Sequence, residues 1–366
     1  MNKIIVFEPN DFHGVVVAGV VGYFKDLGYY CDVYIKDNTY KELSEIDFGE
    51  NILLHRYKDE VDEILFSEKT REYDFVFFTS MEYSTDGEMY RYLDLIGENI
   101  KTKYGYMGIY HTAYFIRIFN EEKAASEGRI FCISDFQKQV PGVRTLFPGY
   151  YYFSKGRDYT YDNNSIKIVT LGSMLDEGMI VDGKSGLSSA DRDRITFYHV
   201  GGEIVPIKRQ IYLKMKKAAY RLASVCIKKC RKKALRYEVI ELGRVSLKRL
   251  LEIVNDSSFI HFGIDNHSYR GMHYLSSSTS GSRLIVLGTG VLPICHSWVN
   301  KLYFSDENAG ISYNRELASG LTEALNMSDA DYKKRTEELI SLQQRVYEES
   351  LGNLKDAIHD ITMGTP

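Results

Sequence analysis

The sequence has no long apolar run, no cysteine framework and no excess of basic charge. Its longest uninterrupted apolar stretch, VVVAGVVGYF at 15–24, is about half as long as the ~20 residues that a membrane-spanning helix needs. Its five cysteines are scattered and odd in number, so we expect small buried side chains in a reducing cytoplasm rather than disulfides. A net charge of −4 lacks the basic footprint of a nucleic-acid-binding protein, and no nucleic acid is expected as a partner.

A secretory signal is also missing, because MNKIIVFEP (1–9) enters a strand-like run directly and contains no cleavage-site pattern. The sequence therefore predicts a cytoplasmic protein. Its 366 residues are too many for one ordinary hydrophobic core and fit two domains. An apolar content of 44% with 26% charged residues is typical of soluble globular chains.

Several motifs of nucleotide and hydrolase chemistry are absent. The first strand-like run is not followed by G-x-G-x-x-G, which argues against a dehydrogenase. Neither G-x-x-x-x-G-K-[ST] nor G-x-S-x-G occurs, so a P-loop NTPase and an α/β-hydrolase are not expected. No Asp-x-Asp pair follows a predicted strand, and we expect no metal cofactor.

Strand-like and helix-like segments alternate along almost the whole chain. The strand-like runs are KIIVFEP, CDVYIKD, NILLHRY, DFVFFTS, YGYMGIYH and RIFCIS, then IKIVTLGS, RITFYHVGG, YEVIELGRV, SFIHFGI and VLPICHS. Continuous apolar runs are expected of strands covered on both faces, and a β–α alternation specifies a parallel, doubly wound sheet.

A polar, turn-rich segment at 154–165, SKGRDYTYDNNS, interrupts this alternation and predicts an interdomain linker. The sequence therefore predicts an α/β chain of two Rossmann-like, doubly wound domains, at 1–153 and 166–330. The tail at 329–361 predicts one long helix or two joined helices, with Asp329 as the N-cap. Ligands of open α/β sheets bind at the carboxyl ends of the strands, so the cleft between the domains is the expected active site.

Titratable residues follow predicted strands of the N-terminal half. Asn10, Asp11, His13 and Gly14 follow the first strand, and His111 follows YGYMGIY. A histidine at such a rim can take a proton from a hydroxyl near neutral pH, and a carboxylate can orient the histidine or act as the base itself. We expect Gly14 to let the first helix begin close to a bound substrate. The alternative is that Asp11 caps the first helix and His13 only packs beside it.

Small, hydroxylated and charged residues follow the strands of the C-terminal half, where they could hold a nucleotide diphosphate. These candidates are Gly172, Ser173, Gly202, Glu203, Met272, Ser280, Gly281, Ser282 and Arg283, with Lys184 as a second cation after Arg283. The segment at 280–283 precedes a short apolar helix, and a helix N-terminus with serine donors and one guanidinium suits a diphosphate. An ordinary serine N-cap explains the same pattern.

This layout resembles the GT-B-fold glycosyltransferases. The segment PNDFHGVVVAGVVGYFKDLGYYCDVYI resembles the start of many such enzymes, GIYHTAYF their mid-domain strand ending in histidine, and RIFCISDFQKQV a later strand and helix. SRLIVLGTGVLPIC is similar to the donor-site helix and its G-x-x-P turn, and the tail at 331–366 to the helix that packs back on the N-terminal domain. The glutamate pair of many retaining members is absent from 269–290, where Ser-Arg-Leu looks exostosin-like.

The resemblance implies an N-terminal acceptor domain and a C-terminal domain that binds a nucleotide-diphosphate sugar. Asp11 or His13 would be the general base if the enzyme inverts; if it retains, the leaving phosphate would assist and the histidines, His111 included, would position the acceptor. We expect a hexosyltransferase-like enzyme of bacterial surface polysaccharide synthesis, acting on a glycan or lipid-linked acceptor. The alternatives are a catalytically inactive glycan- or nucleotide-binding protein and a nucleotide-sugar epimerase.

A strongly basic segment lies at 207–236, with twelve Lys and Arg and no acidic residue. Its apolar residues recur at roughly helical spacing, which predicts a basic amphipathic helix. Such a helix can lie on an anionic membrane, with about 1 kcal/mol from each basic residue near the lipid. Peripheral binding to the inner membrane is therefore one expectation, and a solvated helix on the domain surface is the other.

Overall fold

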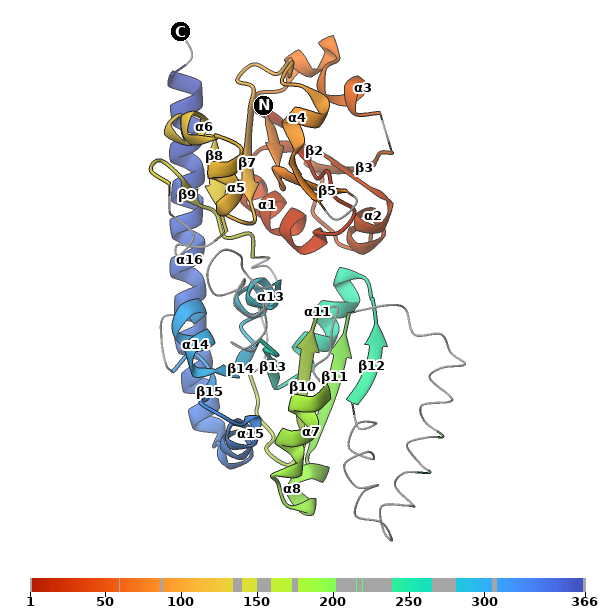
Figure 1. The fold of residues 1–366 in the computed structure, drawn as a ribbon, viewed down its shortest axis with the longest axis vertical. Coiled ribbons are helices and arrows are strands. Elements are labelled where there is room, and N and C mark those ends of the chain that lie inside the picture. Colours follow the sequence, from red (N-terminus) through yellow and green to blue (C-terminus); the bar gives the residue numbers. More distant parts are fainter. Residues whose placement is uncertain are drawn as a thin grey trace.

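The computed structural model describes residues 2–58, 60–85, 88–133, 140–149, 159–172, 177–201, 215, 219, 239–264, 281–304 and 308–364. Two parallel sheets with flanking helices form most of the structure (Figure 1). The long C-terminal helix α16 (Asp329–Met363) runs alongside both of them. The predicted fold class, two Rossmann-like units in an α/β chain, is confirmed.

The N-terminal sheet has seven strands in the order β3-β2-β1-β4-β7-β8-β9. Its strands are β1 (Lys3–Phe7), β2 (Tyr30–Ile35), β3 (Ile52–Arg56), β4 (Val76–Phe78), β7 (Tyr106–Tyr110), β8 (Ile130–Cys132) and β9 (Arg144–Thr145). All neighbouring pairs are parallel. From β1 the chain adds β2 and β3 on one side, and it then returns to add β4 and the later strands on the other side. The carboxyl ends of β1 and β4 therefore form the topological switch point, where open α/β sheets bind ligands.

Short helices and one hairpin accompany this sheet. The helices are α1 (Gly14–Asp26), α2 (Asp37–Leu43), α3 (Val61–Leu65), the 3₁₀ helix η1 (Glu68–Glu72), α4 (Tyr92–Ile96), α5 (Tyr114–Ile118) and α6 (Glu122–Ser126). The segment at 80–90 contains the antiparallel strands β5 (Glu82–Thr85) and β6 (Glu88–Arg91). Tyrosine and threonine in these runs favour strand over helix.

The C-terminal sheet has six strands in the order β12-β11-β10-β13-β14-β15. Its strands are β10 (Ile166–Leu171), β11 (Ile195–Val200), β12 (Val239–Gly243), β13 (Phe259–His261), β14 (Leu292–His296) and β15 (Ile311–Tyr313). Its helices are α7 (Glu177–Ser185), α8 (Ser189–Asp193), α11 (Leu247–Asn255), α13 (Gly281–Thr289), α14 (Ser297–Phe304) and α15 (Leu317–Asn326). The pairing is again parallel throughout.

Helix α16 is a single helix, and its N-cap is Ser328 rather than the predicted Asp329. The Ser328 hydroxyl accepts a hydrogen bond from the Asp331 backbone N–H at 3.1 Å, as serine N-caps commonly do. Asp329 occupies the first helical position, where its carboxylate pairs with Lys333 at 2.9 Å. Further along, α16 contacts the N-terminal half, because the Ser350 hydroxyl accepts from the Phe147 N–H at 3.0 Å.

Buried apolar side chains of both halves form one continuous cluster. It includes Val17 and Phe24 of α1, Ile168 of β10 and Leu339 of α16. Helix α1 passes so close to the chain at Pro148 that a Cβ on Gly19 would lie 2.0 Å from the Pro148 carbonyl oxygen. Three of the five cysteines, Cys31, Cys132 and Cys295, are free and buried.

Candidate active site

The carboxyl ends of β1, β4 and β7 bring six polar residues together. The strands are neighbours in the sheet, and the residues that follow them are Glu8, Asn10 and His13 after β1, Thr79 and Ser80 after β4, and His111 after β7. His13 and His111 lie at the same edge of the sheet, as expected. Their rings stack with centroids 4.3 Å apart and an interplanar angle of 21°.

Glu8 lies at the centre of this group and is fully buried. Its Oε2 accepts hydrogen bonds from the Thr79 hydroxyl at 2.6 Å and the Ser80 hydroxyl at 2.7 Å. Its Oε1 accepts from the Asn10 N–H at 2.8 Å. Burial opposes ionisation of this carboxyl, but the nearby His13 and the hydroxyl donor outweigh it and lower the pKa of Glu8 to about 2. Glu8 is therefore a buried carboxylate that stays charged.

Ser80 determines which nitrogen of His13 carries the proton. Since Ser80 donates its one hydroxyl hydrogen to Glu8, its oxygen must accept from His13 Nδ1, which lies 2.9 Å away. The same nitrogen is 3.6 Å from Glu8 Oε1. A neutral imidazole protonated on Nδ1 keeps its lone pair on Nε2. His13, whose side chain is 25% exposed, is thus set up to accept a proton through Nε2.

His111 is held differently, although it contacts the same serine. Its Nε2–H donates to the Thr79 carbonyl oxygen at 2.8 Å, and the Ser80 oxygen lies 3.1 Å from the same nitrogen. Burial and the neighbouring His13 lower the pKa of His111 to about 3. The ring is therefore neutral near pH 7 and can position a neighbour, whereas it is a poor proton acceptor.

Glu82, at the start of β5, is a second buried carboxyl beside the rim. Its Oε1 accepts from the His111 N–H at 2.8 Å, and its Oε2 is buried without a partner among the described residues. Burial is the main cause that raises the pKa of Glu82 to about 8. Glu82 is consequently a neutral acid at pH 7, which explains how an unpaired oxygen is tolerated there.

The remaining candidates after β1 fix the loop at 10–14 to its surroundings. Asn10 is buried, and its amide donates to Glu8 Oε1 and to the Glu82 carbonyl oxygen, each at 3.1 Å. The Asp11 carboxylate accepts from the Asn38 N–H at 2.7 Å, so it caps α2 rather than the first helix. Gly14 also contacts α2, because a Cβ there would lie 2.5 Å from Glu42 Oε2.

The donor-side candidates are only partly covered by the described residues. Ser173, Gly202, Glu203, Met272 and Ser280 lie outside them, as does the basic segment at 207–236 apart from 215 and 219. Gly172 directly follows β10 and has a φ of +127°, and a Cβ on Gly201 would lie 2.0 Å from the Gly172 carbonyl oxygen. The close approach of these two turns therefore requires glycine.

Gly281, Ser282 and Arg283 form the first turn of α13. The Arg283 Nε donates to the Tyr303 carbonyl oxygen at 3.0 Å, and its guanidinium lies 4.9 Å from the centre of the Phe147 ring. Arg283 thus connects the donor-side helix to a segment of the N-terminal half. Lys184, the second candidate cation, is buried and donates to the Ile195 carbonyl oxygen at 3.2 Å. That bond places it at the amino end of β11, so its expected role is wrong.

Two histidines at the carboxyl edge of the C-terminal sheet were not among the site residues predicted from the sequence. His199 Nε2 donates to the Gly172 carbonyl oxygen at 3.0 Å. His261, at the carboxyl end of β13, is fully buried, and burial lowers its pKa to about 4. Both residues sit inside apolar strand patterns and resemble ordinary core positions in the sequence.

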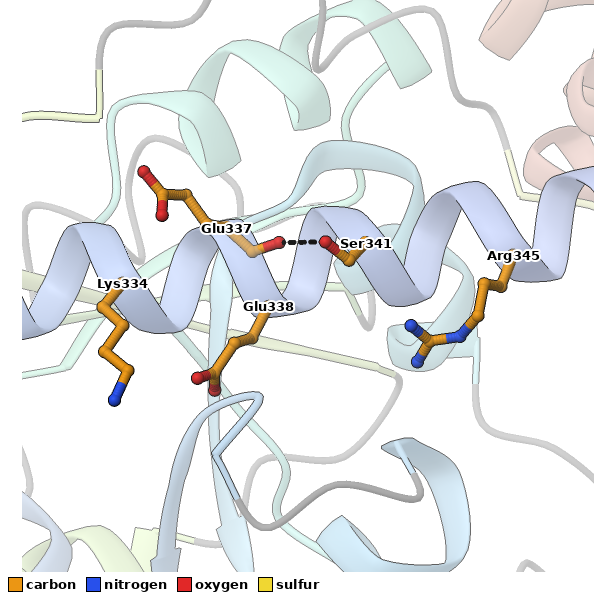
Figure 2. A pocket seen from close by; sticks show the side chains of 5 residues that line it. All are labelled: Lys334, Glu337, Glu338, Ser341 and Arg345. Carbon is orange, nitrogen blue, oxygen red and sulfur yellow. Dashed lines mark hydrogen bonds between the residues drawn. The ribbon is translucent and has the colours of Figure 1, made fainter.

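Elsewhere, a hollow of about 390 Å³ lies on the surface of α16. Its lining side chains, Lys334, Glu337, Glu338, Ser341 and Arg345, all come from that one helix (Figure 2). Both charge signs are present, and the Ser341 hydroxyl donates to the Glu337 carbonyl oxygen of its own helix. None of these residues belongs to the carboxyl edge of either sheet.

Among the described residues, no cluster of His, Cys, Asp and Glu has the arrangement of a metal site. No described helix is both long and apolar enough to cross a membrane.

Solved structures share this architecture over the full chain. A glycosyltransferase from Rickettsia africae matches with a TM-score of 0.58 and 14% identity, covering 100% of this chain and 99% of the other. HepE from Anabaena, in complex with UDP and glucose, matches with a TM-score of 0.56, 10% identity and 100% coverage of both chains. The chain has the GT-B fold.

A third GT-B structure, sucrose-phosphate synthase from Thermosynechococcus elongatus, gives a TM-score of 0.57 at 10% identity and covers both chains fully. No protein-family model and no curated protein sequence matches this chain. The GT-B fold that the order of strands and helices suggested is therefore confirmed by structure.

Proposed function

We propose that this GT-B protein is a glycosyltransferase that moves a sugar from a nucleotide-diphosphate sugar to a hydroxyl of its acceptor. The observation that carries the proposal is the contact chain from ionised Glu8 through Ser80 to His13 Nδ1. It lies at the switch point of the N-terminal sheet, where a GT-B acceptor is expected. HepE, which shares the fold, was crystallised with UDP-glucose, and this supports the class of donor.

His13 acts as the general base if the enzyme inverts. Its Nε2 takes the proton of the acceptor hydroxyl while the oxygen forms a bond to the anomeric carbon and the bond from that carbon to the diphosphate breaks. The Glu8 carboxylate, which is linked to His13 through the Ser80 hydroxyl, offsets the positive charge that develops on the imidazole. The electron pair of the broken bond leaves with the nucleotide diphosphate.

Arg283 and the N-terminus of α13 are the described groups suited to that leaving diphosphate. A guanidinium and the N–H groups of a helix's first turn favour a growing negative charge. Gly172 and the undescribed candidates Ser173, Ser280, Gly202 and Glu203 would complete the donor site. If the enzyme retains configuration, a diphosphate oxygen takes the proton instead, and His13 orients the acceptor. We propose turnover without a metal cofactor, which assays with EDTA test.

The proposed setting is the inner face of a bacterial membrane, with a glycan or lipid-linked glycan as the acceptor and surface polysaccharide as the product. The basic composition of 207–236 supports contact with anionic lipid. Co-sedimentation with vesicles tests this: binding must be stronger to anionic than to neutral vesicles, and equal binding would reject it.

The deciding experiment follows free nucleotide during incubation with UDP-, GDP- and CMP-sugars and a total lipid-linked acceptor fraction. Release of nucleotide that requires the acceptor supports the transferase. A single anomer of the product, identified by NMR, assigns the stereochemistry of transfer. Binding of a nucleotide without turnover of any donor would instead favour an inactive binding protein. An epimerase is not favoured, because Glu8 is already held by hydroxyl and amide donors and Glu82 by the His111 N–H.

A further inference from the structure

Helix α2 is a point of contact between the two halves of the molecule. Arg244, directly after β12, donates to Glu42 Oε1 through Nε at 2.9 Å and through Nη2 at 2.6 Å. Two residues on, the Ser246 hydroxyl donates to Glu45 Oε2 at 3.0 Å. Figure 1 shows α11 of the C-terminal half facing α2 of the N-terminal half across this contact. The rim of one sheet is therefore bonded to a helix of the other.

The same helix holds the loop that carries His13. Asp11 caps α2 through the Asn38 N–H, and Gly14 leaves the space that Glu42 occupies, since its Cβ would lie 2.5 Å from Glu42 Oε2. His13 lies between Asp11 and Gly14 in the chain, at the N-cap position of α1, where its side chain makes no capping hydrogen bond. A shift of α2 is consequently transmitted to the backbone before His13 through the hydrogen bonds of Asp11, while the backbone after it leaves room for Glu42.

The contact is strong enough to bias an equilibrium and weak enough to break. The Arg244 side chain is 43% exposed and that of Glu42 21%, and partly exposed ion pairs contribute little when isolated. Here two donors of one guanidinium share a carboxylate oxygen and a neighbouring hydroxyl bond supports them. Such a pair can change a population several-fold without locking the two halves together.

We propose that Glu42 and Arg244 are positioning residues that align His13 with the donor. Arg244 of the C-terminal half reaches Glu42 of α2 only when the two halves are close together. Helix α2 then sets the position of the loop at 10–14. His13 is therefore correctly placed relative to the donor only when the Arg244–Glu42 contact is formed. This inference rests on the proposed transferase function of the same site.

The test is a charge-swap cycle of Arg244→Glu, Glu42→Lys and the double variant, in the full-length protein. Each single variant should lower kcat for transfer by about fivefold to tenfold, because the reversal removes a weak attraction and adds a repulsion of similar size. The donor KM should stay within about twofold, because neither residue is placed at the donor. The double variant, which restores opposite charges, should recover at least half of the wild-type kcat.

Arg249→Glu is the matched control, because Arg249 lies on α11, close to Arg244 in the chain, but pairs locally with Glu252 at 2.7 Å. It should leave kcat unchanged. Raising the salt concentration should lower wild-type kcat toward that of the single variants, whereas it should not lower the kcat of those variants, because it screens the repulsion between their like charges. Single variants with wild-type kcat, or a double variant no better than the singles, would overturn the proposal.

Hydrogen exchange provides a readout that needs no turnover. Both single variants should exchange faster at 37–45 and also at 10–14, with circular dichroism confirming that they remain folded. Faster exchange confined to 37–45 would show that α2 does not transmit the contact to His13. If the wild type turns over no donor at all, the proposed function fails, whereas the exchange result still decides whether the contact controls the loop.

Discussion

The stacked rings of His13 and His111 share the hydroxyl oxygen of Ser80, at 2.9 and 3.1 Å. Two imidazoles so close cannot both carry charge at little cost, and the structure resolves this by burying one of them. His111 has its pKa lowered to about 3, and His13 keeps a partly exposed ring beside an ionised carboxylate. The pair thus divides into a fixed neutral ring and a partly exposed ring, which is the proton acceptor in the proposed mechanism.

His13→Ala should reduce kcat for an inverting transfer by about 10²- to 10⁴-fold, the usual contribution of a general base. Nucleotide affinity should be unchanged, because His13 lies on the acceptor side. Initial rates and a thermal-shift titration with the nucleotide measure the two quantities. Phe12→Ala controls for loss of packing in the loop, since the Phe12 ring contacts the His13 ring edge to face at 4.5 Å and cannot accept a proton. Full turnover in His13→Ala would remove His13 from the chemistry.

Glu8→Gln should destabilise the fold at neutral pH. The folded-state pKa of Glu8 is lowered to about 2 from 4.5, so its ionisation stabilises the fold above pH 4.5, and this stabilisation is lost as the pH falls toward 2. The expected loss at pH 7 is on the order of 3 kcal/mol. Urea denaturation across this range should show the difference between variant and wild type shrinking toward acid.

Glu82→Gln should have the opposite effect on the pH dependence. The pKa of Glu82 is raised to about 8 from 4.5, so the wild type loses stability as the pH rises from 4.5 to 8, because only the unfolded chain ionises freely. Glutamine keeps the acceptor for the His111 N–H and removes this loss. The variant should match the wild type near pH 4 and exceed its melting temperature at pH 8. A variant that melts below the wild type at pH 8 but matches it near pH 4 would show that Glu82 is charged in the fold.

The sequence predicted the sheets and the histidine rim because both depend on local pattern. Buried parallel strands leave continuous apolar runs, and residues after them must gather at one edge. Glu8 was missed because a carboxylate next to Pro9 looks like a surface residue. Its burial is made tolerable by Thr79 and Ser80, which are distant in the chain. The role of Asp11 at α2 was missed for the same reason, since its partner Asn38 belongs to another element.

Arg283 offers a test of the donor side that separates charge from packing. Its guanidinium lies 4.9 Å from the Phe147 ring centre and 5.5 Å from that of Tyr303, so Arg283→Ala removes both a cation and an interdomain packing contact. Arg283→Lys keeps the charge and loses the planar face. Without nucleotide, both variants should melt below the wild type.

With UDP, the two variants should differ. A hydrogen bond to a charged group contributes roughly 1.5–3 kcal/mol, so Arg283→Ala should bind UDP at least about tenfold more weakly, whereas Arg283→Lys should retain most of the affinity. The increase in melting temperature at saturating UDP reports this directly. The exposed Arg249→Ala on α11 is the control. If Arg283→Ala keeps the wild-type response to UDP, Arg283 is an interdomain packing residue and another group holds the diphosphate.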